Sequence, residues 1–397
     1  MDIFEEPYYR VVKIWSCLTG QWPSQSPTKK FITITIIWIA FFMQFIPQII
    51  AFVVHIKERD VVFEAFSGLV IDIGFIIKYM NAICNADLMK QLFERIRRDW
   101  KLLLNEEEKV PLQYQSTLGY LFSASYVGIC FGTATIYTTE PVFPRFLNIV
   151  LGRNESVPLK MALPLEYIII DKEKHYWLML TISNICVYNI IAVIVSCDVV
   201  FITYVQHTCG LFAVIGCRLK NTPVDKDYLE GHKGRDFLSK SKNISYKHLV
   251  SCIKGHRRAL EFADLLENAY CLNFGLAAVM SLPLISITGV QVVTQANTAE
   301  QLLKTTTFAL SQTAHLFFIC LMSQQLTDKS LQMQESIVGV SWYDISVKSQ
   351  KLLILMTMRS QVPCKLTAAK IMDLSIENFA TMLKTSASYL TMLLSFQ

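Results

Sequence analysis

The sequence has little charge for its length. Only 17% of its 397 residues are Asp, Glu, Lys or Arg, whereas 52% are apolar, and the mean hydropathy is +0.37. The length alone would suggest two or three water-soluble domains, but this composition argues against them. The final stretch, KTSASYLTMLLSFQ, has no charged side chain after Lys384. The scarcity of charge predicts a membrane protein.

The sequence also lacks the patterns that accompany catalysis. It has no phosphate-cradling Gly loop and no nucleophile–base arrangement, and neither His207 and His315 nor the eleven cysteines show metal-ligand spacing. No cysteine falls in the 140–175 stretch, so we expect free, buried thiols rather than a disulfide framework. The first thirty residues have no long apolar core, so we expect no secretory signal. We therefore expect no enzyme, cofactor, metal or nucleic-acid partner.

Long apolar runs are abundant. A helix needs roughly 20 mostly apolar residues to cross the hydrocarbon of a bilayer. Seven runs qualify: Phe31–Ile56, Val61–Cys84, Thr117–Thr139, Tyr176–Leu211, Leu265–Val293, Gln301–Leu326 and Ile371–Phe396. The predicted fold is an all-α, polytopic membrane protein with seven transmembrane helices.

The positive charges indicate the orientation of these spans. Lys and Arg accumulate in cytoplasmic connections. The N-terminus and alternate connections hold 27 of them, whereas the other connections hold 8. We therefore predict an intracellular N-terminus and an extracellular C-terminus. Two sequons lie on opposite predicted sides: Asn154 in an outer loop, where we expect glycosylation, and Asn243 in an inner one.

The cytoplasmic connections contain further helical patterns. His248–Leu272 keeps helical spacing straight into the fifth span, and Lys351–Met358 is apolar but too short to cross a bilayer. We expect cytoplasmic helical extensions that form an anchor region. The predicted division is residues 1–30, a cytoplasmic N-terminal segment; 31–326, spans one to six with their extensions; 327–370, the anchor segment; and 371–397, the seventh span.

Motifs near both ends of the chain resemble those of the insect odorant receptors, which have seven helices and inverted topology. Gly20-Gln21-Trp22-Pro23 is similar to the Gly-x-Trp-Pro that precedes the first span of that family. An ordered C-terminal series also matches: Trp342, Lys351-Leu352-Leu353, Arg359-Ser360-Gln361-Val362-Pro363, Leu366-Thr367-Ala368, Phe379 and Ser388-Tyr389-Leu390. The tail resembles a degenerate form of the gustatory-receptor ending, with Ser388 in place of Thr and Ser395 in place of Gln.

The resemblance implies an odorant-gated, non-selective cation channel in the plasma membrane of olfactory sensory dendrites. It implies a heterotetramer with a co-receptor, in which the seventh span of each subunit surrounds one pore. In this chain Thr381, Thr385, Ser388, Met392, Ser395 and Phe396 recur at helical spacing on one face. By the resemblance, Ser388, Met392, Ser395 and Phe396 would form the pore and gate. A helix–helix seam is the alternative interpretation of that face.

The resemblance places the ligand in the outer half of the bundle, between spans two, three, four and six. A small volatile ligand needs a mostly apolar cavity with few polar groups. The matching residues share helical faces, although plain packing would give the same pattern. They are Phe63, Phe66, Val70, Gly128, Phe131, Thr135, Tyr137, Met179, Ser183, Cys186, Thr307, Phe308 and Ser311.

Other functions remain open at this stage. A G-protein-coupled receptor would need the reverse topology, and the chain lacks both DRY after span three and NPxxY in span seven. A transporter would be indicated by repeat-related broken helices, which are not apparent. A gustatory-type homomeric channel is the nearest alternative. Asp72, Lys78 and Asp198 lie within spans, where charges are costly and often functional, but the sequence does not name their partners.

Overall fold

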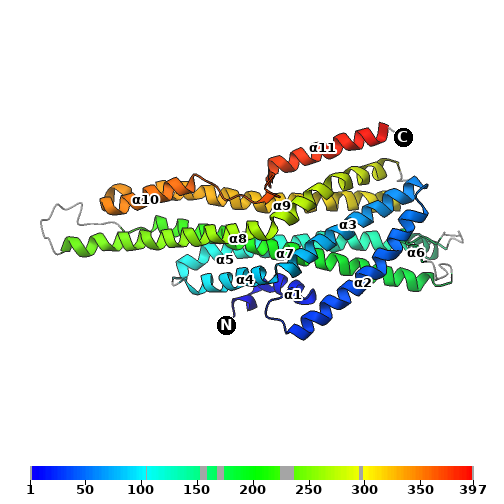
Figure 1. Ribbon diagram of the computed structural model, residues 1–397, viewed down its shortest axis with the longest axis horizontal. Helices are drawn as coiled ribbons and strands as arrows, with labels where there is room; N and C mark the ends of the chain where they lie inside the picture. The colour runs from blue at the N-terminus through cyan, green and yellow to red at the C-terminus, as the bar shows by residue number, and fades with distance from the viewer. Residues whose placement is uncertain are drawn as a thin grey trace.

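The computed structural model describes residues 2–103, 105–152, 159–167, 174–223, 237–294 and 298–395, without the side chains of 237–243. The predicted all-α fold is confirmed, and its long helices lie side by side in one elongated bundle (Figure 1). The helices are α1 Arg10–Leu18, α2 Pro27–Val54, α3 Arg59–Cys84, α4 Ala86–Lys101, α5 Glu106–Thr139, α6 Phe143–Val150, α7 Tyr176–Lys220, α8 Phe237–Thr294, α9 Ala299–Val338, α10 Val347–Ser360 and α11 Ile376–Ser395.

All seven predicted spans are helices in the structure. Five of the described helices, namely α2, α5, α7, α8 and α9, are long and apolar enough to cross a membrane. The other two, α3 and α11, have 26 and 20 residues, so they are about 39 and 30 Å long and could also cross. The first span begins and ends earlier than predicted, because α2 runs from Pro27 to Val54 and the chain turns at His55.

Helix α7 is the axis of the bundle. It packs against α1, α2, α3, α5, α8 and α9. Its second half is buried on every side, including Phe201, Tyr204 and Phe212. A helix that is apolar on nearly every side belongs in a core. The buried charged and ionisable side chains of this half, Asp198 and His207, meet partners on neighbouring helices.

The N-terminal segment closes one side of this core. Phe4 lies edge-on to Trp22 at 5.2 Å and to Phe93 at 5.5 Å between ring centroids. Gly20 has a φ of +71°, which lets the chain turn sharply after α1 and bring Trp22 back onto this cluster. The Gly-x-Trp-Pro motif therefore fixes the segment that leads into α2.

The predicted helical extensions are confirmed as helices. Helix α8 has 58 residues and α9 has 40, and α10 packs against both at the end of the bundle remote from α6 (Figure 1). Leu353 and Met356 of α10 are buried, whereas Leu355 and Met358 on its other side are at least 60% exposed. This chain alone therefore leaves an apolar face of α10 uncovered.

A hairpin precedes the last helix, where the sequence predicted the start of span seven at Ile371. Thr367–Ala368 (β1) pairs with Met372–Asp373 (β2), and α11 begins only at Ile376. Ala369 and Lys370 have φ of +53° and +58° in the turn between the strands. These residue types give no turn signal comparable to Asn-Gly, which is why the sequence did not reveal the hairpin.

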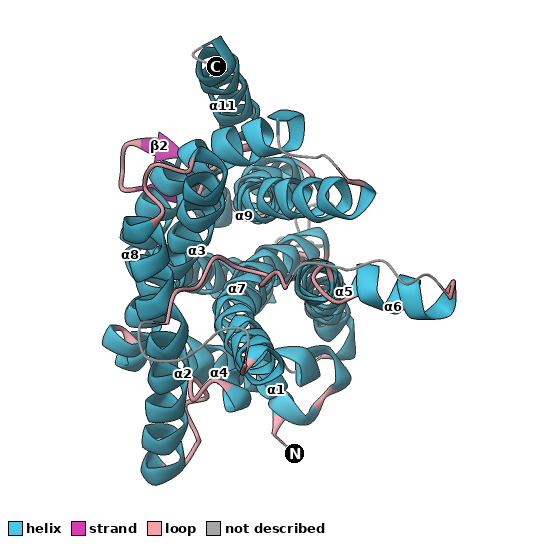
Figure 2. Cartoon of the chain, turned by 90° about the vertical axis from the view of Figure 1, so that its right-hand side faces the viewer, coloured by secondary structure: helices cyan, strands magenta, loops and turns pink. Residues whose placement is uncertain are grey.

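The hairpin is held against α8. The Ala369 amide donates to the Cys271 carbonyl at 2.9 Å, and the Glu267 carboxylate accepts from the Thr367 amide at 2.9 Å. A Cβ at Gly275 would lie 2.5 Å from the Ala369 Cβ, so only glycine permits this contact. Helix α11 leaves from the hairpin and lies on the outside of the bundle, against α8 and α9 (Figures 1 and 2).

Candidate functional site

A mostly apolar cavity of about 170 Å³ lies inside the bundle, and we call it the inner cavity. Helices α3, α5, α7, α8 and α9 form its wall, and Gln44 of α2 and Leu163 of the 159–167 segment complete it. Its apolar lining includes Val70, Ile71, Ala134, Ile190, Ile191, Ile194, Met280 and Leu284. A cavity of about 150 Å³ in another protein holds benzene, so this one accommodates a molecule of similar size or slightly larger.

A second, more polar chamber of about 350 Å³ adjoins it, and we call it the outer chamber. Its charged lining consists of His55, Glu64, Glu140, Lys160, Glu166 and Lys304. Tyr137, Leu163 and Phe308 line both spaces, and the Tyr137 and Phe308 rings are 5.6 Å apart. These three side chains form the partition between the outer chamber and the inner cavity.

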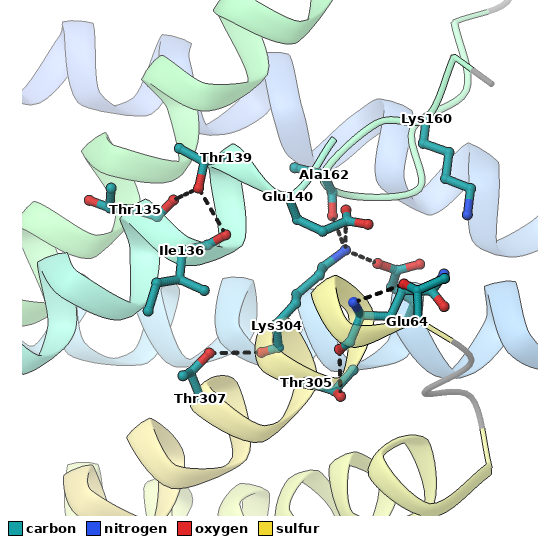
Figure 3. Close-up of polar contacts among 12 residues, drawn as sticks. Glu64, Thr135, Ile136, Thr139, Glu140, Lys160, Ala162, Lys304, Thr305 and Thr307 are labelled. Carbon is teal, nitrogen blue, oxygen red and sulfur yellow. Dashed lines mark hydrogen bonds and ion pairs between the residues drawn. The ribbon is translucent and has the colours of Figure 1, made fainter. Parts of the chain in front are cut away.

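Lys304 of α9 lies beside this partition, and Figure 3 shows its contacts with Glu64, Glu140 and Ala162. Its side chain is 8% exposed, and its ammonium lies 2.6 Å from Glu64 of α3 and 3.6 Å from Glu140 of α5. It also donates to the carbonyl of Ala162 at 3.0 Å and lies 4.5 Å from the centroid of the Tyr137 ring. One lysine thus ties two helices, the 159–167 segment and the partition together.

The opposite end of the inner cavity, which we call the floor, carries a polar network. Lys78 of α3 forms an ion pair with Asp198 of α7, and its Nζ lies 2.7 Å from His315 Nε2 of α9. The Tyr126 hydroxyl of α5 donates to Asp198 Oδ2 at 2.6 Å. Lys78, Tyr126 and His315 line the inner cavity, so three helices bring polar groups of this network to one otherwise apolar space, and Asp198 of α7 joins them.

Further polar side chains of the lining include Gln44, Asp72 and Asn273. Gln44 and Asn273 are 3% and 5% exposed, and no described residue donates to Gln44 Oε1 or Asn273 Oδ1. Asp72 accepts from the Gln48 amide at 3.1 Å when that amide is oriented to satisfy its neighbours. The cavity therefore combines a large apolar wall with a few polar groups, as small-ligand sites do.

The structure brings together some of the predicted ligand-binding residues. Four of the thirteen line the inner cavity: Val70, Tyr137, Phe308 and Ser311. The other nine are not part of that lining: Phe63, Phe66, Gly128, Phe131, Thr135, Met179, Ser183, Cys186 and Thr307. Phe131 packs on Trp15 at 4.9 Å, and Thr135 lies 3.1 Å from the Tyr188 hydroxyl. The cavity-facing stripe of α5 is instead Tyr126, Cys130, Thr133, Ala134 and Tyr137.

Sequence reasoning missed several contributors. Helix α8 supplies Asn273, Ala277 and Met280 to the lining, although the family resemblance indicated only spans two, three, four and six. The charged residues of the spans were the one available signal, because Lys78 and Asp198 lie at the cavity floor.

The predicted pore residues lie on the exposed side of α11. Ser388, Met392 and Ser395 are exposed, whereas Met382 and Ser386 are buried. The Ser386 carbonyl accepts from the Ser286 hydroxyl of α8 at 3.0 Å, so the packed face differs from the predicted stripe. Two predicted sites, the gate residue Phe396 and the sequon at Asn154, lie outside the described residues.

Comparison with known proteins settles the family. The sequence pattern described as 7tm Odorant receptor matches residues 60–387, which is most of the chain. The chain belongs to the insect odorant receptor family. This is a family of receptors and channels rather than of enzymes.

Individual relatives of this odorant receptor are distant. Odorant receptor 67a of Drosophila melanogaster is 28% identical over 143 residues, 36% of this chain and 35% of that protein. Odorant receptor 9a of the same fly is 20% identical over 89% of this chain and 86% of its own length. The structure of insect olfactory receptor OR5 from Machilis hrabei in complex with eugenol superposes with a TM-score of 0.75, at 13% identity and 98% coverage of both chains. This last match shows a shared fold.

Proposed function

We propose that this odorant receptor is the ligand-binding subunit of an odorant-gated, non-selective cation channel. A small volatile ligand occupies the inner cavity, and its binding favours the state in which the pore lined by α11 is open. Together with a co-receptor, this chain forms a heterotetramer. The assembly acts in the plasma membrane, at the sensory dendrite of olfactory neurons.

The ligand site is supported by the chemistry of the inner cavity. Its wall is mostly apolar, and its volume of about 170 Å³ suits a small organic molecule. The fold relative from Machilis hrabei was solved in complex with eugenol, a molecule of this kind. We propose that Val70, Tyr137, Phe308 and Ser311 contact the ligand here, together with residues of α8 that the sequence did not indicate.

The uncovered stripe of α11 is the observation that carries the channel proposal. Within this chain the helix packs through Met382 and Ser386, so Ser388, Met392 and Ser395 face away from α8. The Ser388 and Ser395 hydroxyls donate to carbonyls of their own helix, at 3.0 and 2.7 Å. Satisfied hydroxyls beside a bulky apolar side chain suit a narrow water path that closes by dewetting.

The need for other subunits follows from the same geometry. One helix cannot enclose a pore, and the apolar face of α10, including Leu355 and Met358, is also uncovered. Exposed apolar patches of this kind mark protein contacts. By the family resemblance, Ser395 stands where the co-receptor carries a Gln, so we propose that this chain is a tuning subunit that joins a separate co-receptor.

Cysteine accessibility along α11 tests the proposal. Each of Ser388→Cys and Met392→Cys is expressed with the co-receptor, and a charged, membrane-impermeant thiol reagent is applied while ligand-evoked currents are recorded. We expect these currents to change irreversibly. Ser386→Cys, on the packed face, is the matched control and is expected to be unaffected, as is the chain with only its native cysteines. Equal insensitivity of all variants would show that the stripe does not line a water path.

A further inference from the structure

We propose that the inner cavity selects small, uncharged ligands that carry one hydrogen-bond-accepting oxygen, and that Lys78 donates a hydrogen bond to that oxygen. This inference rests on the proposed function, because it specifies the ligand of the same cavity. The cavity would therefore bind ketones, aldehydes, esters and related molecules more tightly than hydrocarbons of equal shape.

Lys78 has a donor to spare at the cavity floor. An ammonium group carries three N–H bonds and accepts none. One N–H of Lys78 meets Asp198 and a second meets His315 Nε2, at 2.7 Å. In the described part of the chain no third acceptor lies within hydrogen-bond distance of Lys78. A buried donor without an acceptor is costly, and Lys78 lines the inner cavity, where a ligand oxygen can meet this N–H.

His315 is a second partner of Lys78 at the floor. Its Nε2 lies 2.7 Å from Lys78 Nζ and 3.3 Å from Asp198 Oδ2, and because Lys78 can only donate, the shorter contact assigns the lone pair of His315 to Nε2 and the proton to Nδ1. Among the described residues, none accepts a hydrogen bond from His315 Nδ1. His315 lines the inner cavity beside Lys78. The two ring nitrogens of an imidazole point to opposite sides of the ring, so an oxygen bound by Lys78 does not reach His315 Nδ1, and Lys78 is the donor to the ligand.

The charges around the floor favour an uncharged ligand. Asp198 neutralises Lys78, and the neutral tautomer of His315 adds no charge. A cationic ligand would face these donors, and an anionic one would also have to enter a space lined by the carboxyl group of Asp72. The remaining wall is mostly apolar, so a full charge would be desolvated there without a partner. A polar but uncharged group avoids both costs.

The size of the cavity further limits the class of ligands that it can hold. A volume of about 170 Å³ is only slightly larger than the 150 Å³ cavity that holds benzene. One ring with a short oxygen-bearing substituent fills such a space. The oxygen would lie at the floor and the ring against the apolar side chains of α7 and α8.

Isosteric ligand pairs test the inference on the unmodified protein. Each pair replaces a carbonyl oxygen by a methylene group: acetophenone and α-methylstyrene, benzaldehyde and styrene, cyclohexanone and methylenecyclohexane. Affinity is measured on the receptor–co-receptor complex in lipid nanodiscs from the ligand-dependent rise in melting temperature. We expect the carbonyl member of a pair to bind at least about tenfold more tightly, because a hydrogen bond from a charged donor is worth about that much. Equal affinities within pairs, or no binding by any member, would overturn the inference.

Substitutions test whether the preference for the carbonyl ligand arises at the floor of the inner cavity. Lys78→Met alone would leave Asp198 unpaired, so the double variant Lys78→Met with Asp198→Asn keeps the network neutral. In this variant we expect the ratio of affinities for the two members of a pair to fall close to one. The ratio should persist in Lys101→Met, the same change on the exposed end of α4. An unchanged ratio in the folded double variant would show that Lys78 does not donate to the ligand oxygen and would overturn the inference.

Currents separate this inference from the proposed function. A carbonyl preference in binding without any ligand-evoked current would overturn the channel function and leave the ligand class standing. Ligand-evoked currents with equal potency for both members of a pair would overturn the ligand class and leave the channel function standing.

Discussion

Lys78 of α3 and Asp198 of α7 form an ion pair in the middle of the bundle, with side chains 7% and 10% exposed. The two residues are 120 positions apart in the chain. Charges inside a membrane bundle are rare and usually paired. This pair joins a helix of the cavity wall to the central helix, at the level of the proposed ligand oxygen.

We predict that breaking the pair on one side is worse than removing both charges. Lys78→Met leaves a buried carboxylate without its cation, and such changes cost about 3–5 kcal/mol in folding free energy. Adding Asp198→Asn should restore a large part of this loss. The measurement is the melting temperature of each variant in nanodiscs. If the double variant is as unstable as Lys78→Met, the ion pair is not the reason for the loss.

We predict that Lys304 controls the rate at which ligand exchanges with the inner cavity. Lys304→Met removes the contacts to Glu64, Glu140 and the Ala162 carbonyl that hold the partition. Losing charge-assisted hydrogen bonds worth about 1.4 kcal/mol or more would raise the open population of the partition on the order of tenfold. Association and dissociation rates should rise together, with a smaller change in affinity.

These rates are measured by applying and withdrawing short pulses of ligand on membrane patches while the current is recorded. Lys160→Met is the matched control, since this lysine lines the same outer chamber and is exposed. The double variant Lys304→Met with Glu140→Gln avoids leaving Glu140 as an unpaired buried charge. Exchange rates equal to those of Lys160→Met would contradict the role of Lys304.

We predict a pH-dependent tether beside the outer chamber. His55, which follows the last residue of α2, has its pKa raised by hydrogen bonds to Glu58 at 2.8 Å and to Glu166 at 3.1 Å. Because the folded pKa lies above the ordinary value of about 6.5, the tether stabilises the folded state below that pH. Its contribution is lost as the pH rises through the folded pKa.

Hydrogen exchange of the 159–167 segment measures this tether. Protection should fall as the pH is raised from about 6 to 8.5, after correction for the intrinsic exchange rate. His55→Gln should remove this dependence, whereas His175→Gln, a change at an exposed histidine, should keep it. A profile that is identical in the wild type and His55→Gln would contradict the tether.

The sequence predicted the helices well because each has a long apolar run or clear helical spacing. It predicted the cavity poorly, and α7 explains why. Ser183 and Cys186 were predicted to face ligand, but Val187, Ile190 and Ile191 line the cavity. In this first half of α7 the exposed side is also apolar, since Trp177, Leu178 and Ile185 are exposed, so no polar face marks the side that lines the cavity.

The pairings between distant residues could not be predicted from the sequence either. Lys78, Asp198 and His315 are each recognisable as costly polar groups in spans, but their meeting depends on how α3, α7 and α9 pack. The hairpin at Thr367–Asp373 depends on left-handed conformations of Ala369 and Lys370, which are imposed by contacts with α8 rather than by local propensity.

We predict that the chain is oriented with its N-terminus inside the cell. In microsomes, Asn154→Gln should abolish a glycosidase-sensitive band and Asn243→Gln should leave it unchanged. The reason is the excess of Lys and Arg in the connections that we assign to the cytoplasm. A sugar on Asn243 alone would reverse the topology and favour a G-protein-coupled receptor.

Direct gating by a ligand in the inner cavity is tested most directly by current recording in excised patches. Patches from cells that express this chain and a co-receptor are held in solution without nucleotides, and ligand-evoked currents are compared with those of Ala134→Trp. Ala134 is 2% exposed and lines the cavity, so a tryptophan there would fill the ligand space. We predict that the wild-type currents persist after excision and that the variant loses them while reaching the membrane normally. Currents that vanish on excision, or equal ligand potency in both proteins, would contradict direct gating from the inner cavity.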